Sequence, residues 1–303
     1  MTWHRPIGTA SRDGWDVVVE PDAAGWEHTG LHVGRLAAGE SRRLGAGHRE
    51  HVVVPLSGSV TVSVDGAAGE HEVTLAGRAS VFAGPTDVAY VPAGSGLTVT
   101  ALGDARVAVC FAVTRAGTAG ADVPFRHVAA AEVPVELRGS GIASREVRNF
   151  GIPGVLEAES IIACEVVTPA GNWSSWPPHK HDEERPGEET QLEEIYYFEV
   201  APEAGSPKVA GTDPVGYQRV YGTEHRPIEV LAEVRPGDVV LVPHGWHGPA
   251  MAAPGYDLYY LNVMAGPGEE RAWLIRDDPA HGWVRDTWTD RPVDPRLPFG
   301  GAR

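Results

Sequence analysis

Glycine and proline interrupt this sequence every few residues, and that spacing restricts its fold more than any other feature. The 37 glycines and 25 prolines make up about a fifth of the 303 residues. Between them lie short apolar or β-branched runs, at 15–20, 51–56, 59–64, 79–82, 88–91, 97–100, 106–113, 157–167, 195–200, 217–221, 228–234, 239–242 and 257–264. Strands of this length between turn signals are typical of β-sandwiches and barrels. The sequence therefore predicts an all-β protein, with one short helix at 269–275.

Composition and charge exclude several classes of protein. Apolar residues reach 42% and charged residues 22%, which is enough apolar material for a large core and argues against disorder. The net charge of −16 disfavours binding to nucleic acid or to an anionic membrane. No apolar run of about 18 residues predicts a membrane span, and the first residues do not resemble a signal peptide, so we expect a cytoplasmic protein. Cys110 and Cys164 lie in separate apolar runs and form neither a disulfide framework nor a thiolate metal site by themselves.

A weak internal repeat predicts two similar domains. Residues 88–94 read VAYVPAG and residues 239–245 read VVLVPHG, so their prolines stand 151 positions apart, about half the chain length. Strand patterning lapses between Thr114 and Ser144, where glycine and alanine dominate. We therefore expect an N-terminal β domain at 1–135 and a C-terminal one at 136–303.

The C-terminal half contains a set of residues that could bind a metal ion. In an extended strand, His179 and His181 point to the same side, so both imidazoles could reach one cation. Alone, this pair would be read as two solvated histidines. Glu193 and Glu194 begin the next strand, however, and His247 follows a later turn and strand. Three imidazoles and one carboxylate suit zinc, iron, manganese or nickel better than calcium or magnesium.

Two positions in this set have alternatives. Strand alternation places Glu194 on one face with Tyr196, and Glu193 on the other face, so either carboxylate could be the ligand. His244 competes with His247 as the last imidazole, although we expect His244 to lie at the surface.

The first domain lacks a complete set of the same kind. His48, Glu50 and His51 stand where a similar site would begin, but residues 92–96, PAGSG, contain no histidine. We expect this domain to be metal-free and structural.

The order of these motifs resembles the cupin superfamily, in which His-x-His, Glu and a final His follow one another. The resemblance implies tandem cupin β-barrels, with His179, His181, a glutamate and His247 as ligands. Two departures are present: thirteen positions separate His181 from Glu194 across an acidic insertion, and the final spacing to His247 is one residue short. In related uronate ketol-isomerases the ligand glutamate precedes an Ile/Val-Tyr pair, which selects Glu194.

Longer blocks of the C-terminal half resemble the 5-deoxy-glucuronate isomerase family of myo-inositol catabolism. These blocks are 171–182, 193–197, 218–221, 237–243 and 256–266. Trp176 and Trp246 stand where many members would have tyrosine. The resemblance implies a two-cupin isomerase that converts 5-deoxy-D-glucuronate to 5-dehydro-2-deoxy-D-gluconate. It also implies one divalent transition metal per chain, for which we expect zinc first, with manganese or iron as alternatives.

This chemistry requires a base and a cation. An aldose–ketose isomerisation through an enediolate needs a group that removes a carbon-bound proton, and the candidates are Glu193, Tyr196 or a hydroxide on the metal. A hydride shift is the alternative route. The substrate carboxylate needs a local positive charge, for which we expect Arg219 first and Arg148 second. Lys180 points away from the ligand face.

The remaining expectations concern the sugar, the partner and rival functions. Tyr260 and Asn262 share a face of the last long strand and could reach substrate hydroxyls. A homodimer is plausible from the fold. The rival functions are a ketol-isomerase acting on 4-deoxy-5-hexosulose-uronate, a metal-dependent cupin dioxygenase, and a non-catalytic sugar-binding protein with two cupin domains.

Overall fold

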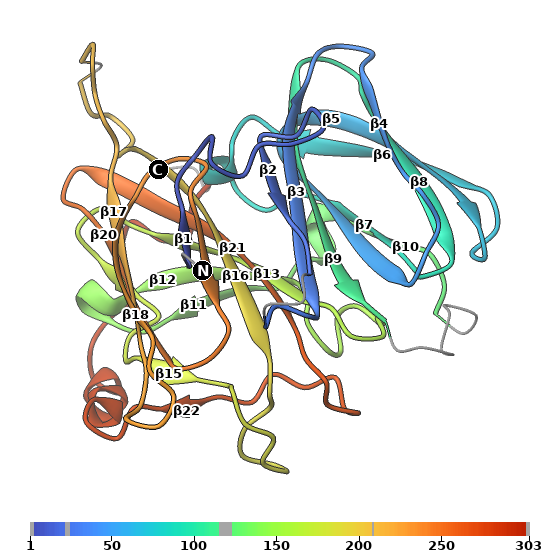
Figure 1. Ribbon diagram of the computed structural model, residues 1–303. Helices are drawn as coiled ribbons and strands as arrows, with labels where there is room; N and C mark the ends of the chain where they lie inside the picture. The colour runs from blue at the N-terminus through green and yellow to red at the C-terminus, as the bar shows by residue number, and fades with distance from the viewer. Residues whose placement is uncertain (1–2, 22–24, 115–122, 208, 301–303) are drawn as a thin grey trace.

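Antiparallel strands form three sheets in the part of the chain that the computed structural model describes, residues 3–21, 25–114, 123–207 and 209–300 (Figure 1). The first sheet has nine strands and comes entirely from the N-terminal half. Its strands are β2 (Val17–Val19), β3 (Thr29–Leu36), β4 (Ser41–Leu44), β5 (Arg49–Gly66), β6 (His71–Arg78), β7 (Val88–Val91), β8 (Ser95–Ala101), β9 (Ala105–Val113) and β10 (Arg126–Val128).

The other two sheets come mainly from the C-terminal half. The seven-stranded central sheet contains β1 (His4–Arg5), β19 (Val239–Val242), β16 (Glu193–Pro202), β21 (Tyr256–Ala265), β13 (Ile162–Thr168), β12 (Arg145–Gly151) and β11 (Val135–Arg138), in that order. The six-stranded sheet contains β18 (Glu229–Val234), β17 (Gly216–Tyr221), β20 (Trp246–Ala252), β15 (His179–Lys180) and β22 (Arg276–Asp277), with β14 (Trp173–Ser174) beside β20.

Helices contribute little to the described residues. They are four 3₁₀ segments: η1 (Val81–Ala83), η2 (Ala130–Glu132), η3 (Gly141–Ala143) and η4 (Gly282–Trp288). The prediction of a helix at 269–275 is wrong, because this segment is irregular. The side chain of Arg271 donates to the carbonyl oxygens of Gly151, Leu156 and Ile161 at 2.7 Å each, which ties the segment to neighbouring loops. No helix in the described parts of the chain is long and apolar enough to cross a membrane.

Strand β5 joins two runs that the sequence separates. It continues through Gly58, whose φ is 76°, and its pairing shifts register on both sides of that residue. A Cβ at Gly58 would lie 2.5 Å from the carbonyl oxygen of Asp104, so only glycine fits there. The bend lets one strand belong to both parts of the N-terminal sheet.

The two halves repeat one strand order. The path β10-β7-β5-β9-β3-β2 in the N-terminal half matches β1-β19-β16-β21-β13-β12 in the central sheet. The repeated sequences at 88–94 and 239–245 contain β7 and β19, which occupy the same place in their sheets. In this match Glu50 corresponds to Glu193, and His51 to Glu194, because His51 pairs with Val91 and Glu194 with Val242.

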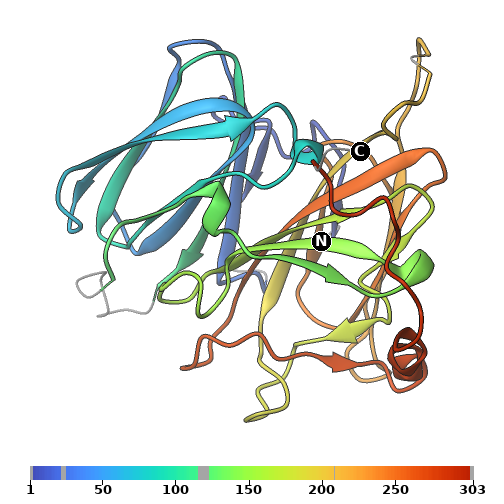
Figure 2. The same cartoon turned by 180° about the vertical axis from the view of Figure 1, so that it is seen from behind.

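The hydrophobic side chains form three cores. One lies inside the N-terminal unit and includes Val53 and Val99. A second joins both halves, with Val52 from β5 and Leu261 from β21 among its members. The third lies between the central and six-stranded sheets and includes Tyr260. The central sheet is therefore buried on both faces, which explains its long apolar strands. Figure 2 shows the N-terminal half packed beside the C-terminal half.

The chain crosses the expected domain boundary at its beginning. The first strand, β1, pairs with β19 of the C-terminal half, with His4 opposite Val240. The division at 135/136 falls at the start of β11, which pairs with β12. It stays a prediction, and residues 115–122 of the expected joint lie outside the described residues.

Two glutamates at matching positions join the halves. Glu193 accepts hydrogen bonds from the backbone N–H groups of residues 27–29, at 2.6–3.0 Å. Glu50 accepts three bonds from residues 159–161, at 2.6–2.8 Å. Each carboxylate thus satisfies three consecutive donors of the other half, and the interface is symmetric at this point.

Candidate metal centre

Three ligand-type side chains meet inside the second barrel. His181 follows β15, Glu194 lies in β16 and His247 in β20. The Oε2 atom of Glu194 is 3.1 Å from His181 Nε2 and 3.2 Å from His247 Nε2. All three side chains are at most 2% exposed, and their ligand atoms lie within 4.8 Å of one another. This group, named here the histidine cluster, can hold a metal ion.

His179 lies beside the histidine cluster. It pairs with His247 across β15 and β20, and their ring centres are 4.5 Å apart. Its ring centre is 6.4 Å from that of His181. His179 is therefore adjacent to the three converging groups without belonging to the tightest set.

Backbone carbonyls orient all three imidazoles. The Nδ1 atoms of His179, His181 and His247 lie 3.2–3.3 Å from the carbonyl oxygens of residues 177, 192 and 245, respectively. An Nδ1–H that donates to a carbonyl leaves the Nε2 lone pair available to a metal. Among the described residues, the buried Nε2 of His247 has no partner in hydrogen-bonding geometry, although Glu194 Oε2 lies 3.2 Å away. A divalent transition metal would satisfy this atom, so the residues fit such an ion.

Burial and neighbouring charges set the protonation of the histidine cluster and of the adjacent His179. Burial lowers the pKa of His179 and His247 well below the usual value, and the nearby imidazoles act in the same direction. Burial also lowers the pKa of His181, but the carboxylate of Glu194 overrides it and raises that pKa. Burial raises the pKa of Glu194. His179 and His247 are consequently neutral at pH 7, which is the form that binds metals.

Hydroxyl groups line the barrel next to Glu194. The hydroxyls of Tyr196 and Tyr260 each lie 3.2 Å from Ser175 Oγ. Burial raises the pKa of both tyrosines, most strongly that of Tyr196, which lies close to the charge of Glu194. Both phenols therefore remain protonated and can donate hydrogen bonds. Asn262 shares this face, opposite Tyr196, and its amide lies 3.5 Å from the carbonyl oxygen of Ile195.

Glu193 does not reach the histidine cluster. Its position in β16 directs it to the opposite face, toward the N-terminal half, where residues 27–29 occupy its oxygens. The Oγ1 of Thr29 donates a further bond at 2.9 Å. A carboxylate held by four donors serves the interface, and it is not available as a base beside the histidine cluster.

The two arginines expected at the substrate also lie elsewhere. Arg148 is fully buried, donates to Glu146 at 2.6 Å and to the carbonyl oxygen of Val81, and faces the core between the two halves. Arg219 is exposed on β17, and its guanidinium carbon lies 4.4 Å from the centre of the Tyr221 ring. Its neighbours in β17 are buried in the barrel, so Arg219 points outward.

Lys180, Asp182 and Glu189 form a buried ion-pair group next to the histidine cluster, and the sequence did not indicate this group. Lys180 donates to Asp182 at 2.5 Å and to Glu189 at 2.7 Å. Asp182 also accepts from the backbone N–H of Gly245, two residues before His247. The acidic insertion thus supplies fixed partners that hold the loop carrying the last histidine. The His-x-His spacing was a signal for the ligands, but no pattern marked Glu189 as buried.

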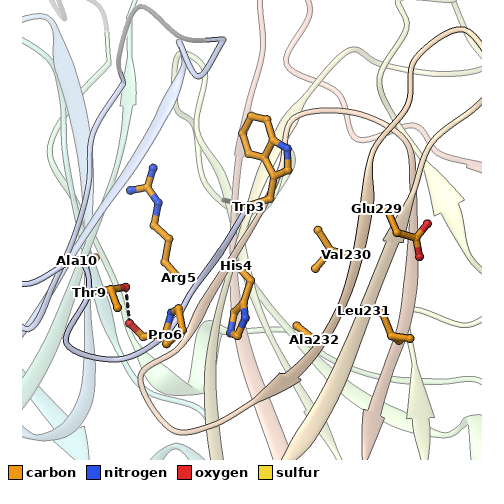
Figure 3. Close-up of a pocket in the computed structure, with 10 residues that line it drawn as sticks. All are labelled: Trp3, His4, Arg5, Pro6, Thr9, Ala10, Glu229, Val230, Leu231 and Ala232. Atoms are coloured by element: carbon orange, nitrogen blue, oxygen red, sulfur yellow. Dashed lines mark hydrogen bonds between the residues drawn. The ribbon is translucent and has the colours of Figure 1, made fainter. Parts of the chain in front are cut away.

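A pocket of about 700 Å³ lies away from the histidine cluster, between the N-terminal arm and β18 (Figure 3). Its lining includes Trp3, His4 and Arg5 on one side and Leu231 on the other. It shares no residue with the histidine cluster. His244 lines a different pocket with Arg226, so it is separate from the three converging groups.

Comparisons with known proteins agree with this architecture. A crystal structure of an IolB-like protein from Salmonella typhimurium LT2 superimposes with a TM-score of 0.80 at 34% identity, covering 94% of this chain and 100% of that one. An oxalate decarboxylase from Lactobacillus farciminis matches with a TM-score of 0.57 at 12% identity, over 82% of this chain and 79% of that one. The expected all-β fold of two tandem cupin barrels is confirmed.

Sequence relatives extend over nearly the whole chain. The 5-deoxy-glucuronate isomerase of Geobacillus kaustophilus is 41% identical over 93% of this chain and 95% of its own length. The one of Bacillus subtilis strain 168 is 38% identical over 82% of this chain and 84% of its own. The model of the KduI/IolB family matches residues 3–284. The chain belongs to the KduI/IolB family.

Proposed function

We propose that this protein is an aldose–ketose isomerase that converts 5-deoxy-glucuronate to 5-dehydro-2-deoxy-gluconate in inositol catabolism. The relatives that carry this activity in their names match most of the chain at about 40% identity. The observation that carries the proposal for this molecule is the buried convergence of His181, Glu194 and His247 in the second barrel. The reaction moves a carbonyl between adjacent carbons, and a divalent ion held at such a centre can assist it by polarising that carbonyl.

The metal would be held by His179, His181, Glu194 and His247. Zinc is our first choice, because three imidazoles and one carboxylate suit it, with manganese or iron as alternatives. A bound divalent ion supplies Lewis acidity, which polarises the carbonyl and stabilises negative charge on oxygen. The Bacillus subtilis oxalate decarboxylase, which shares the fold, has Mn(II) centres.

The hydroxyl groups beside the histidine cluster would bind and orient the sugar. Tyr196 and Tyr260 keep their protons, so each can donate a hydrogen bond to a substrate oxygen, and Ser175 links the two. A donor placed where negative charge develops stabilises the transition state more than the ground state. Tyr196 therefore acts as a donor to the developing oxyanion. With Glu193 held at the interface, a hydride shift between the two adjacent carbons, with the proton passing between their oxygens, is the route that needs no side-chain base. Asn262 completes the polar face of the sugar site.

An isomerase assay tests the proposal directly. We expect the metal-loaded protein to convert 5-deoxy-glucuronate to the 2-ketose isomer, followed by NMR, and to lose this activity with a chelator. Adding back zinc, manganese or iron in turn identifies the preferred ion. No conversion by metal-loaded protein, or an unchanged rate after metal removal, would contradict the proposal.

The rival functions are outcomes of the same assay. Faster turnover of 4-deoxy-5-hexosulose-uronate would assign the protein to that reaction, and binding of either acid without turnover would leave a sugar-binding protein. Oxygen uptake with either acid would indicate a dioxygenase. A homodimer and a cytoplasmic location stay predictions.

A further inference from the structure

One buried arginine of the second barrel lacks an acidic partner. Arg145 begins β12 and is 4% exposed. In the described parts of the chain, no carboxylate lies within 4 Å of its guanidinium nitrogens. Its Nη1 donates to the carbonyl oxygens of Ala143 at 3.0 Å and Trp176 at 3.4 Å. Burying a guanidinium costs free energy, which protein structures usually offset by pairing it with an anion.

Other buried arginines show what a purely structural role looks like. Arg78 is paired with Glu165, and Arg148 with Glu146. Arg271 uses Nε, Nη1 and Nη2 to donate to three carbonyl oxygens. In the described parts of the chain, Nη1 is the only guanidinium nitrogen of Arg145 that donates a hydrogen bond. Its Nε and Nη2 remain as a pair of donors, which is the arrangement that binds a carboxylate with two parallel hydrogen bonds.

Strand register directs Arg145 to the side of the histidine cluster. Glu146 and Arg148 face the core between the halves, so Arg145 and Val147 face the opposite way. Val147 belongs to the same core as Tyr196 and Tyr260, inside the second barrel. The sequence drew attention to Arg148, but the barrel-facing arginine of this strand is Arg145.

Contacts link Arg145 to the proposed reaction site. It donates to the carbonyl oxygen of Trp176, and the preceding residue, Ser175, contacts the hydroxyls of Tyr196 and Tyr260. Arg145 is thus near the histidine cluster without being a ligand.

A pocket lies near the same arginine. Its volume is about 390 Å³, and Trp173, Trp176, Trp283 and Trp288 line it. The guanidinium carbon of Arg145 lies 5.5 Å from the centre of the Trp288 ring. Ala143 and Trp176, whose carbonyls accept from Arg145, line the pocket too. Arg145 itself is not among the lining residues, so it lies behind Ala143, Trp176 and Trp288, which separate it from the pocket.

Arg145 brings a buried positive charge to an acidic protein, and the neighbouring Arg138 and Arg285 are themselves paired with Glu136 and Asp277. Burial lowers the pKa of Arg145 to about 10, and the charges of Arg138 and Arg285 act in the same direction. The whole chain carries a net charge of −16, which repels an anionic sugar at long range. An acid substrate would gain from a short-range positive group, and Arg145 itself remains charged at pH 7.

We propose that Arg145 binds the carboxylate of the uronate substrate and so makes the enzyme specific for acids. This inference rests on the proposed isomerase function. The aldehyde end would lie at the histidine cluster, and the carboxylate at Nε and Nη2 of Arg145. Arg219, on the outside of β17, then has no part in binding.

The test compares two substrates in several variants. The substrates are 5-deoxy-glucuronate and 5-deoxy-glucose, its neutral counterpart with a hydroxymethyl group in place of the carboxylate. We expect Arg145→Met to lower kcat/KM for the acid about 10- to 100-fold, mainly through KM, because a charge-assisted contact is lost. Its kcat/KM for the neutral sugar should change less than about threefold.

Two further variants keep the result interpretable. Arg145→Lys retains the charge and should fold even if Arg145→Met does not; we expect a smaller loss for the acid, because an ammonium cannot form the two parallel bonds. Arg219→Ala serves as the matched control, with wild-type KM for both sugars. Metal content and melting temperature are measured for each variant.

Each result has a defined meaning. Equal losses for the two sugars, or an unchanged KM for the acid in both Arg145 variants, would overturn the role of Arg145. If the wild-type protein does not turn over the acid at all, the proposed function fails, and that result is seen before any variant is compared.

Discussion

The two barrels share a strand order but differ in what fills them. In the second barrel, Glu194 of β16 meets His181 and His247. In the first, the position matching Glu194 is His51, which is buried and lies 5.9 Å from Phe111, centre to centre, with Arg49, His32 and Glu20 as charged or titratable neighbours. Gly96 stands 151 positions before His247, where the last ligand would be needed. The fold alone therefore does not make a metal site; a few barrel-facing residues decide it.

Unlike the interiors of the barrels, the faces that join them are alike. There the two halves keep the same device: Glu50 and Glu193 occupy matching positions, and each holds three consecutive N–H groups of the other half. The polar contact that joins the halves has remained symmetric, whereas the barrel interiors have not. This contrast separates residues that hold the molecule together from residues that can perform chemistry.

The largest expected effect comes from exchanging a residue of the histidine cluster. We expect His181→Ala to lose the metal and at least about a thousandfold of kcat/KM, because the Lewis acid supplies several kcal/mol of stabilisation. His51→Ala, which changes the position of the first barrel that matches Glu194, should retain the metal. Metal analysis by mass spectrometry and circular dichroism check both. Metal loss in the His51 variant would break the comparison.

The next effect concerns the symmetric interface. Glu50→Gln and Glu193→Gln each remove a charged acceptor from three backbone donors, so we expect each to lower the free energy of unfolding by about 2–4 kcal/mol. Denaturant titration measures it. The kcat of both variants should stay within about threefold of wild type. A large fall in kcat for Glu193→Gln alone, with unchanged stability, would instead restore Glu193 as the catalytic base.

The effect that is smallest per pH unit is a pH dependence that belongs to the first barrel. Burial, with a contribution from Arg49, lowers the pKa of His51 to about 3. The unfolded chain binds a proton at this residue near pH 6.5, and the folded chain does not until about pH 3. Stability therefore falls as the pH decreases through this window, by up to about 1.4 kcal/mol per pH unit.

Replacing the histidine isolates that contribution. We expect His51→Asn to reduce the slope of unfolding free energy against pH by up to one proton between about pH 6 and pH 4. Denaturant titrations of wild type and variant at several pH values measure it. Identical slopes would show that His51 is not buried in its neutral form.

Much of the fold could be predicted from local patterns. Short apolar runs between glycines and prolines indicated the strands, and the 151-residue repeat placed β7 and β19 at matching positions. The failures were local too. The helix at 269–275 did not form, because Arg271 ties that segment to three distant carbonyls. No short-range pattern indicates contacts of that kind.

Side-chain direction was harder to predict than residue type. Alternation separated Glu193 from Glu194 and paired Tyr196 with the latter, as the structure has them. It could not say what covers each face of a strand that is buried on both sides. Arg148 and Arg219 have suitable chemistry, but one faces the other half of the molecule and the other faces solvent.

The sequence by itself indicated the strand-forming runs, a repeat that divides the chain into two β halves and the chemical types that a metal needs, because these follow from short-range periodicity and motif spacing. Only the tertiary structure decided which groups converge. The closing of the barrel brings His181, Glu194 and His247 within reach of one ion and turns Glu193 into an interface residue. It also leaves Arg145 without an acidic partner in the described parts of the chain. Those outcomes depend on packing between strands far apart in the chain, which the order of residues does not display.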